Sequence, residues 1–152
     1  MAHWTTTTTA DASPEQVLEV LTRPEAIRDW SPVPFEVEDL DGLRLEAGSY
    51  ARVTGNLAGV RVGFDVEVHA ADEDGLELTA DGPISIDVHY GLAPVEGGSE
   101  VTASVSVRRG GGLTGRVLAK ATSALLAAGA LDGAAGRIAR AAETSPALAL
   151  AA

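Results

Sequence analysis

The sequence predicts a single α+β domain in which a seven-stranded, curved antiparallel sheet wraps one long C-terminal helix. Two observations predict this fold class. Between residues 35 and 108, apolar and polar residues alternate with a period of two, and short turns separate the alternating runs. That pattern is typical of antiparallel strands with one buried face and one solvated face. Residues 113–143 then form an Ala-rich helical segment, the only element long enough to cover the apolar face.

The chain begins with a strand and two short helices. Residues 3–9 include five consecutive threonines, whose β-branched side chains favour a strand. Ser13-Pro14-Glu15-Gln16 combines an N-cap serine, a proline at the first helical position and a glutamine that can complete a capping box, which predicts a helix over 14–22. Pro24 begins a second helix that ends near Trp30. Both helices are too short to cover the sheet, so we expect them to close one end of it.

Six further strands follow, and their alternation predicts which side chains face inwards. The strands are expected at 35–38, 50–56, 60–69, 76–80, 84–92 and 101–107. The facing of 50–56 depends on the next turn. A two-residue turn that pairs Gly55 with Val60 points Ala51 and Val53 inwards, whereas a turn longer by one residue points Arg52 inwards instead.

The C-terminal helix contains three glycines and a shift in its apolar stripe. Leu118 and Leu125 lie about a third of a turn away from Ile138, and a bend near Gly129 would reconcile the two stripes. The glycines either allow a partner helix to approach closely or make room for a ligand or the sheet. The domain is expected to cover residues 1–144, with 145–152 as a loosely held tail.

Composition excludes several classes of function. The chain has no cysteine, which removes disulfides and thiolate chemistry. The N-terminus has neither a basic segment nor an apolar run, and no apolar stretch reaches the ~20 residues of a membrane span, so a cytoplasmic protein without a signal peptide is expected. The net charge of −11 argues against a nucleic-acid partner. Residues 108–152 hold six bases and two acids, which favours a basic helix that offsets an acidic sheet over a docking strip.

The order of the elements resembles the SRPBCC superfamily, whose START or Bet v 1-like members have the helix-grip fold. The resemblance covers residues 3–143 and is carried by the turn Ala12–Val17, by Thr22-Arg23-Pro24 before Trp30, and by Leu45-x-x-Gly48. Within the superfamily the chain is most similar to bacterial members described as polyketide cyclase/dehydrase and lipid-transport-like. Such members often have Trp where this chain has Leu18, at the pocket entrance.

A cavity is expected between the sheet and the helix, because only 4% of the residues are aromatic and little bulk is available to fill the space. The alternation predicts an apolar lining in which Tyr90 carries the only polar atom. The residues predicted to bind a ligand are Trp30, Val53, Val62, Phe64, Val66, Leu78, Ile86, Val88, Tyr90, Val105, Leu118, Ala121 and Leu125.

Few residues in the sequence are candidates for catalysis, polar ligand contacts or metal binding. Tyr90 could donate to a ligand carbonyl or bond to backbone or water, and Trp30 could gate the pocket or pack in the core. Asp132 is interpreted as a helix-surface acid, and the spacing Asp87-x-His89 is common by chance and predicts no metal. No nucleotide-binding glycine motif is present in the sequence, so no cofactor is expected.

The leading interpretation is therefore binding or transport of a small hydrophobic ligand, lipid-like or polycyclic, with no catalytic residue. The resemblance also implies an alternative, a polyketide aromatase/cyclase-like or dehydratase-like enzyme in which Tyr90 orients the substrate. A third interpretation is a module that modulates a partner protein through Arg116 and Lys120. The sequence leaves the oligomeric state open.

Overall fold

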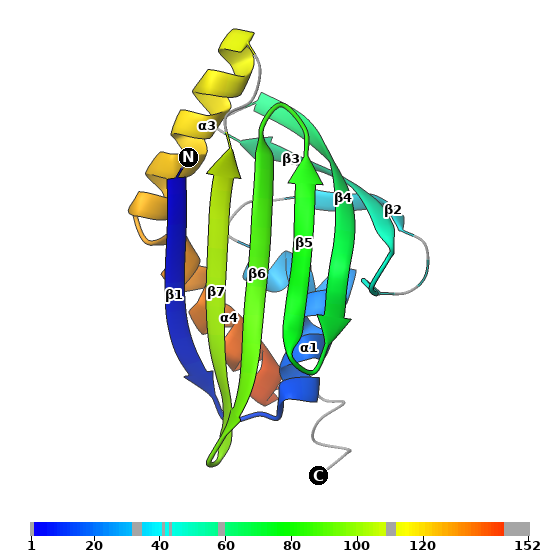
Figure 1. Ribbon diagram of the computed structural model, residues 1–152, viewed down its shortest axis with the longest axis vertical. Coiled ribbons are helices and arrows are strands. Elements are labelled where there is room, and N and C mark those ends of the chain that lie inside the picture. The colour runs from blue at the N-terminus through cyan, green and yellow to red at the C-terminus, as the bar shows by residue number, and fades with distance from the viewer. Residues whose placement is uncertain are drawn as a thin grey trace.

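Seven strands form one antiparallel sheet, as predicted. A computed structural model describes residues 2–31, 35–40, 42, 44–57, 60–108 and 112–144 of the chain. The strands are β1 (Ala2–Ala10), β2 (Phe35–Leu40), β3 (Tyr50–Leu57), β4 (Val60–Asp72), β5 (Gly75–Asp81), β6 (Ser85–Val95) and β7 (Gly98–Arg108). Their order in the sheet is β1-β7-β6-β5-β4-β3-β2, and the helices lie on one side of it (Figure 1). The predicted tail, 145–152, lies outside the described residues.

The two short helices begin and end where the sequence predicts. They are α1 (Pro14–Thr22) and α2 (Pro24–Trp30). The capping box of α1 is complete, because the Gln16 N–H donates to Ser13 Oγ at 3.3 Å and the Ser13 N–H donates to Gln16 Oε1 at 2.7 Å. This cap satisfies two backbone donors that the first turn of a helix otherwise leaves unpaired.

The predicted long C-terminal helix is two helices, α3 (Gly112–Ala127) and α4 (Ala130–Thr144), so the prediction of one continuous helix is wrong. Gly129 has a φ of 96°, a left-handed conformation that ends α3. The segments Gly115–Ala127 and Ala130–Glu143 meet at 61°, so the bend predicted near Gly129 is present. Among the described helices, none alone is long and apolar enough to cross a membrane, although this bent pair passes that test when its two segments are counted together.

The two C-terminal helices have different neighbours. α4 packs against β1, α1 and α2, whereas α3 contacts β3 and β7. In Figure 1, α3 lies along one end of the sheet and α4 continues behind it. The sheet therefore packs against α4 mainly through β1, and α3 contacts it through β3 and β7.

The facing of β3 is as predicted, although its register is not. Gly55 pairs with Val62 and Leu57 pairs with Val60, whereas we expected Gly55 opposite Val60. The error is two residues, and because side chains alternate with a period of two it does not change the face. Ala51 is buried, and Arg52 points outwards and donates to Asp65 at 2.8 Å. The alternative in which Arg52 faces the cavity is thereby excluded.

Three strands, β4, β6 and β7, extend three residues beyond a predicted end. A register shift between Val68 and Ala70 breaks the alternation of β4, which continues to Asp72. A bulge of this kind moves the following side chains to the opposite face of the sheet. The period-two pattern in the sequence therefore stops at the bulge, although the strand itself continues. β6 and β7 likewise continue into the tight turn that joins them.

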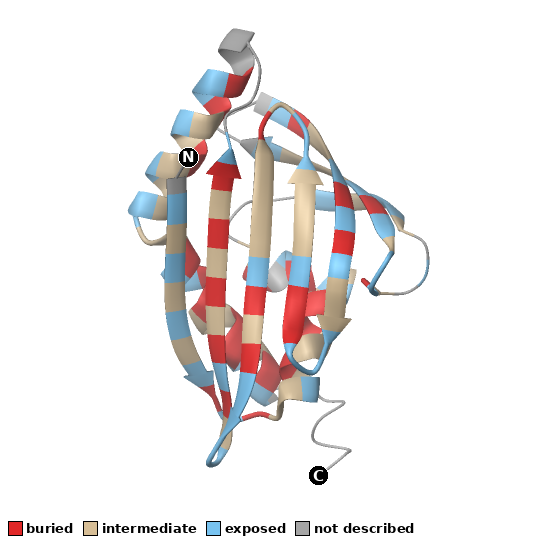
Figure 2. Cartoon of the chain, in the orientation of Figure 1, coloured by how far each residue is buried: buried red, intermediate tan, exposed pale blue. Residues whose placement is uncertain are grey.

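The core lies between the sheet and α1 and α4. Buried and half-buried residues alternate along β7, where Val101, Ala103 and Val107 point inwards (Figure 2). Leu21 of α1 and Ile138 of α4 are fully buried. The packing there is tight, and the space left open lies elsewhere on the same face.

A candidate ligand cavity between the sheet and the helices

A cavity of about 300 Å³ lies between the inner face of the sheet and the helices. Six strands contribute to its wall, and all four helices contribute to its floor and rim. Its lining is almost wholly apolar and consists of Leu21, Ile27, Trp30, Ser31, Val37, Leu45, Ala51, Val53, Gly55, Asn56, Val62, Phe64, Val66, Leu76, Leu78, Ala80, Ile86, Val88, Tyr90, Val105, Thr122, Leu125, Leu126, Leu131 and Ala134.

Burial varies along the cavity and distinguishes its two ends. Trp30 and Tyr90, at 7% and 5% exposure, mark a closed end against α1 and α2. Phe64 and Leu125 are half-buried, and Asn56 at the end of β3 is exposed. The lining is therefore buried at the Trp30–Tyr90 end and reaches solvent at Asn56, near the end of β3.

Eleven of the thirteen residues predicted to bind a ligand line this cavity. The exceptions are both on α3. Leu118 is fully buried in the core, and Ala121 is half-buried away from the cavity. The face that α3 presents to the cavity is formed by Thr122, Leu125 and Leu126.

Sequence alternation could not identify the lining residues that come from the helices and from the segment before β3. Leu21 and Ile27 come from α1 and α2, and Leu131 and Ala134 come from the first turns of α4. The apolar spacing within each helix predicts that these side chains are buried, but does not say what they are buried against. Leu45, which precedes β3, lies within one of the motifs that carry the family resemblance.

Trp30 is held firmly in place and does not act as an exposed gate. Its indole Nε1–H donates to the Val20 carbonyl at 2.9 Å, and its own carbonyl accepts from Arg137 Nε at 3.1 Å. Its ring meets the Tyr90 ring edge to face, with centroids 5.8 Å apart and planes at 76°. The packing alternative for Trp30 is therefore the correct one, and the packed indole also forms part of the cavity wall.

Among the described residues, Tyr90 provides the one free polar side-chain group at the closed end. Within the described part of the chain, its hydroxyl makes no hydrogen bond to another residue. Burial raises the pKa of the Tyr90 hydroxyl, because an apolar environment disfavours the phenolate. Thr122 also lines the cavity, but its Oγ1 donates to the Leu118 carbonyl at 2.8 Å.

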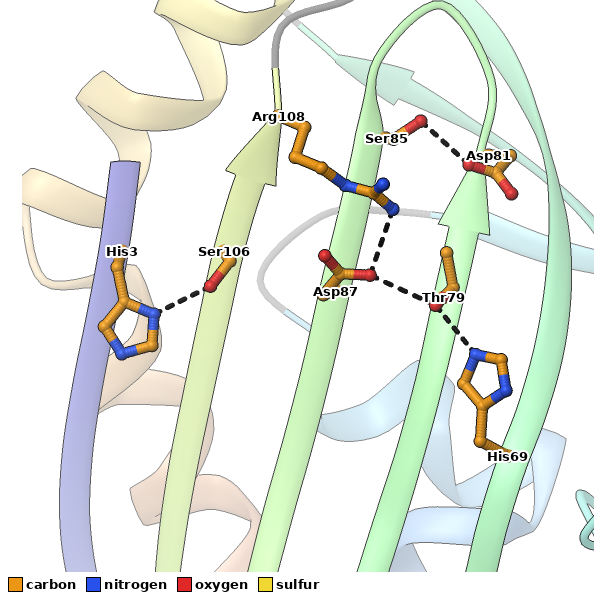
Figure 3. Close-up of polar contacts among 8 residues, drawn as sticks. All are labelled: His3, His69, Thr79, Asp81, Ser85, Asp87, Ser106 and Arg108. Carbon is orange, nitrogen blue, oxygen red and sulfur yellow. Dashed lines mark hydrogen bonds and ion pairs between the residues drawn. The ribbon is translucent and has the colours of Figure 1, made fainter. Parts of the chain in front are cut away.

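The charged and imidazole groups of the described residues lie away from the cavity. No Asp, Glu, Lys, Arg or His is among its described lining residues. On the outer face of the sheet, Asp87 accepts from Thr79 Oγ1 and from Arg108 Nη2, both at 3.1 Å (Figure 3). His69 Nε2 lies 2.8 Å from Thr79 Oγ1 in the same row, which crosses four strands.

The remaining candidates for polar chemistry are also on the surface. Asp132 accepts a hydrogen bond from Thr6 at the surface of α4, as expected for a helix-surface acid. His89 is exposed on β6, and no cluster of three metal-ligating side chains occurs in the described ranges. Arg116 and Lys120 are exposed on α3, on the same helix as exposed Val117.

Comparison with known proteins agrees with this architecture. The sequence profile of the family described as polyketide cyclase/dehydrase and lipid transport matches residues 1–143. No curated protein matches the chain.

Solved structures with the same fold include protein CV1439 from Chromobacterium violaceum, with a TM-score of 0.69 and 13% identity, over 95% of this chain and 100% of that one. Ara h 8.0201 matches with a TM-score of 0.58 and 17% identity, over 90% and 97%. DynU16, from the dynemicin biosynthetic locus, matches with a TM-score of 0.59 and 19% identity, over 93% of this chain and 47% of that one. At these identities the likeness concerns the fold.

Proposed function

We propose that this chain, which belongs to the polyketide cyclase/dehydrase and lipid transport family of the SRPBCC superfamily, binds and carries a small hydrophobic molecule in the cavity between its sheet and helices. The apolar lining is the observation that carries the proposal. Each CH₂ group moved from water into such a site gains about 0.8 kcal/mol, so a ligand without charged groups can bind through burial alone. A polar ligand leaves its own groups unpaired there, at about 1–3 kcal/mol each.

The size of the cavity limits the ligand. A volume of about 300 Å³ is at the lower end of the range for small-molecule sites. At the ~30 Å³ that a water molecule occupies in the liquid, the same space corresponds to roughly ten waters. The proposed ligand is therefore a compact bicyclic or medium-chain molecule, and a two-chain lipid exceeds the space available without rearrangement of α3.

The family description and the likeness to DynU16 also favour a second candidate, a cyclase-like or dehydratase-like enzyme. Enolate chemistry of that kind needs a base to remove a proton and a donor to stabilise the developing oxyanion. Tyr90 can serve as the donor, but the described lining offers no carboxylate, imidazole or amine as the base. Binding without turnover therefore has the stronger support.

A cavity-filling substitution tests the proposed binding. Val88 lines the cavity, and its neighbour His89 is exposed on the opposite face of β6. Val88→Trp inserts an indole into the cavity, whereas His89→Trp adds the same side chain outside it. With the neutral fluorophore N-phenyl-1-naphthylamine as the probe, we expect binding to the wild type and to His89→Trp, and binding at least about tenfold weaker to Val88→Trp, a loss of ~1.4 kcal/mol.

Two results would contradict the proposed function. One is the absence of saturable probe binding to the folded wild type. The other is equal affinity in all three proteins, with circular dichroism showing that Val88→Trp is folded, because the probe then binds outside the cavity.

A further inference from the structure

We infer that the ligand is a neutral molecule with one hydrogen-bonding oxygen, an alcohol, phenol or ketone, held at the closed end of the cavity by the Tyr90 hydroxyl. The inference rests on the proposed function and narrows it to a ligand class. It excludes carboxylate-bearing ligands such as ionised fatty acids, and it ranks oxygen-bearing ligands above plain hydrocarbons of the same shape.

The Tyr90 side chain lies in the cavity lining with its hydroxyl free to bind a ligand. Tyr90 is 5% exposed, lines the cavity and makes no hydrogen bond within the described part of the chain. Buried polar groups in native proteins nearly always have a partner, and a missing partner calls for an explanation. A ligand oxygen in the cavity supplies one, because the phenol can both donate and accept.

The other polar side chains of the buried lining already have partners within the protein. The indole N–H of Trp30 donates to the Val20 carbonyl, and the hydroxyl of Thr122 donates to the Leu118 carbonyl. Ser31 has a partner of its own, and Asn56 is at the exposed end. Among the described residues, the closed end therefore presents one free polar group, which matches a ligand with one polar atom at that end.

A negatively charged ligand finds no counter-charge in the described lining. The described lining has no cationic side chain. The guanidinium group of Arg137 is on α4, outside the lining, and its Nε–H donates to the Trp30 carbonyl. A carboxylate in this cavity would be desolvated without a counter-charge, which strongly disfavours the ionised form. A neutral oxygen has no such cost and keeps the hydrogen bond.

The Tyr90 ring is already oriented by its contact with Trp30. Its ring packs edge to face against Trp30, which is itself held by two hydrogen bonds. A donor that is already oriented loses little rotational freedom on binding, so more of the hydrogen bond is retained as affinity. The raised pKa of Tyr90 also keeps the phenol protonated through neutral and moderately alkaline pH.

A matched series of probes tests the inference. Naphthalene, 2-naphthol, 2-acetylnaphthalene and 2-naphthoate share one bicyclic skeleton and differ in their polar group. Titrations at pH 7.5 use the wild type, Tyr90→Phe and, as a control, Tyr50→Phe, which makes the same chemical change at a tyrosine that is 61% exposed and outside the cavity. In the wild type we expect the naphthol and the ketone to bind about tenfold more tightly than naphthalene, and the naphthoate to bind more weakly than both.

The variants then assign this preference to a residue. In Tyr90→Phe the naphthol and the ketone are expected to lose their advantage over naphthalene, whereas in Tyr50→Phe the advantage is kept. A second measurement does not depend on any variant. In wild-type protein labelled with ¹³C at tyrosine Cζ, the ketone is expected to shift the Tyr90 resonance more than naphthalene does.

The outcomes separate this inference from the proposed function. If none of the probes binds the wild type, the proposed function fails. If all four bind with equal affinity, or if the preference for oxygen survives in Tyr90→Phe, the cavity binds ligands but Tyr90 does not select them, and this inference is overturned. Tightest binding of the naphthoate would overturn it as well.

Discussion

Tyr90 and its surroundings show what a single residue contributes to this protein. The alternation of β6 predicts that Tyr90 faces inwards, and it does. Alternation does not predict that Trp30, 60 positions earlier in the chain, packs against the Tyr90 ring. This contact, and the lack of a partner for the hydroxyl among the described residues, are properties of the assembled cavity.

Burial of Tyr90 predicts a specific loss of stability at alkaline pH. The pKa of Tyr90 is raised above its unfolded value of about 10, so above pH 10 the unfolded chain releases a proton that the native protein keeps. The stabilising contribution is fully present below pH 10 and is lost as the pH rises. Urea unfolding at pH 8 to 11 should show a decrease that approaches about 1.4 kcal/mol per pH unit from this group.

The control for this pH effect is the second tyrosine. Tyr90→Phe should remove the decrease attributed to the buried phenol, whereas Tyr50→Phe should leave it in place because Tyr50 is exposed. Equal pH profiles for the wild type and Tyr90→Phe would show that the native hydroxyl titrates as freely as the unfolded one.

At the scale of elements, the break between α3 and α4 shapes the cavity. Gly129 takes a left-handed conformation that other residues rarely adopt, and the chain changes direction there by 61° between the two helices. α4 continues into the core, while α3 turns Thr122, Leu125 and Leu126 towards the sheet. Gly133 is exposed on α4 and outside the lining, so it makes no room for a ligand.

The roles of these glycines are separable by substitution. Gly129→Ala is expected to destabilise the protein by about 1–2 kcal/mol, because the φ of 96° is strained for any residue with a Cβ atom. Gly136→Ala, inside α4, is expected to stabilise it by about 0.5–1 kcal/mol, because a Cβ atom there would come no closer than 4.0 Å to Arg140. Urea unfolding measures both. Equal effects of the same sign would mean that Gly129 is not required for the break.

At the scale of the whole molecule, charge is distributed unevenly. The first 107 residues hold 20 acids and 5 bases. The ion pairs between described side chains, such as Arg52–Asp65 and Arg108–Asp87, lie at the surface, where solvent and salt screen their attraction. Self-repulsion from a net charge of −11 is therefore expected to outweigh their attraction.

Salt should consequently stabilise the protein. Raising NaCl from 20 mM to 500 mM shortens the screening length well below ~10 Å and weakens the long-range repulsion, which should raise the free energy of unfolding by about 1 kcal/mol. Glu73→Gln, which removes a charge from the exposed acidic turn 72–74, should stabilise the protein at low salt and have less effect at high salt. A free energy of unfolding that falls with salt would show that the ion pairs dominate.

The sequence alone determined the sheet, the two short helices and the face on which each strand residue lies. These properties follow from local chemistry: the period-two alternation of β4 and β7, the capping box at Ser13, and the prolines at the first turns of α1 and α2. A register error of two residues at Gly55 did not affect the predicted facing, for the same reason of periodicity.

Only the tertiary structure decided where the cavity lies and which residues close it. Leu21, Ile27 and Ala134 join the lining because three helices pack against the sheet in a way that no periodicity specifies, and Leu118 is buried in the core instead. Alternation and capping depend on neighbours in the chain, whereas an enclosed volume depends on how separate elements pack. For this reason the sequence predicted an apolar wall, and only the folded structure showed that the Tyr90 ring in that wall packs against Trp30.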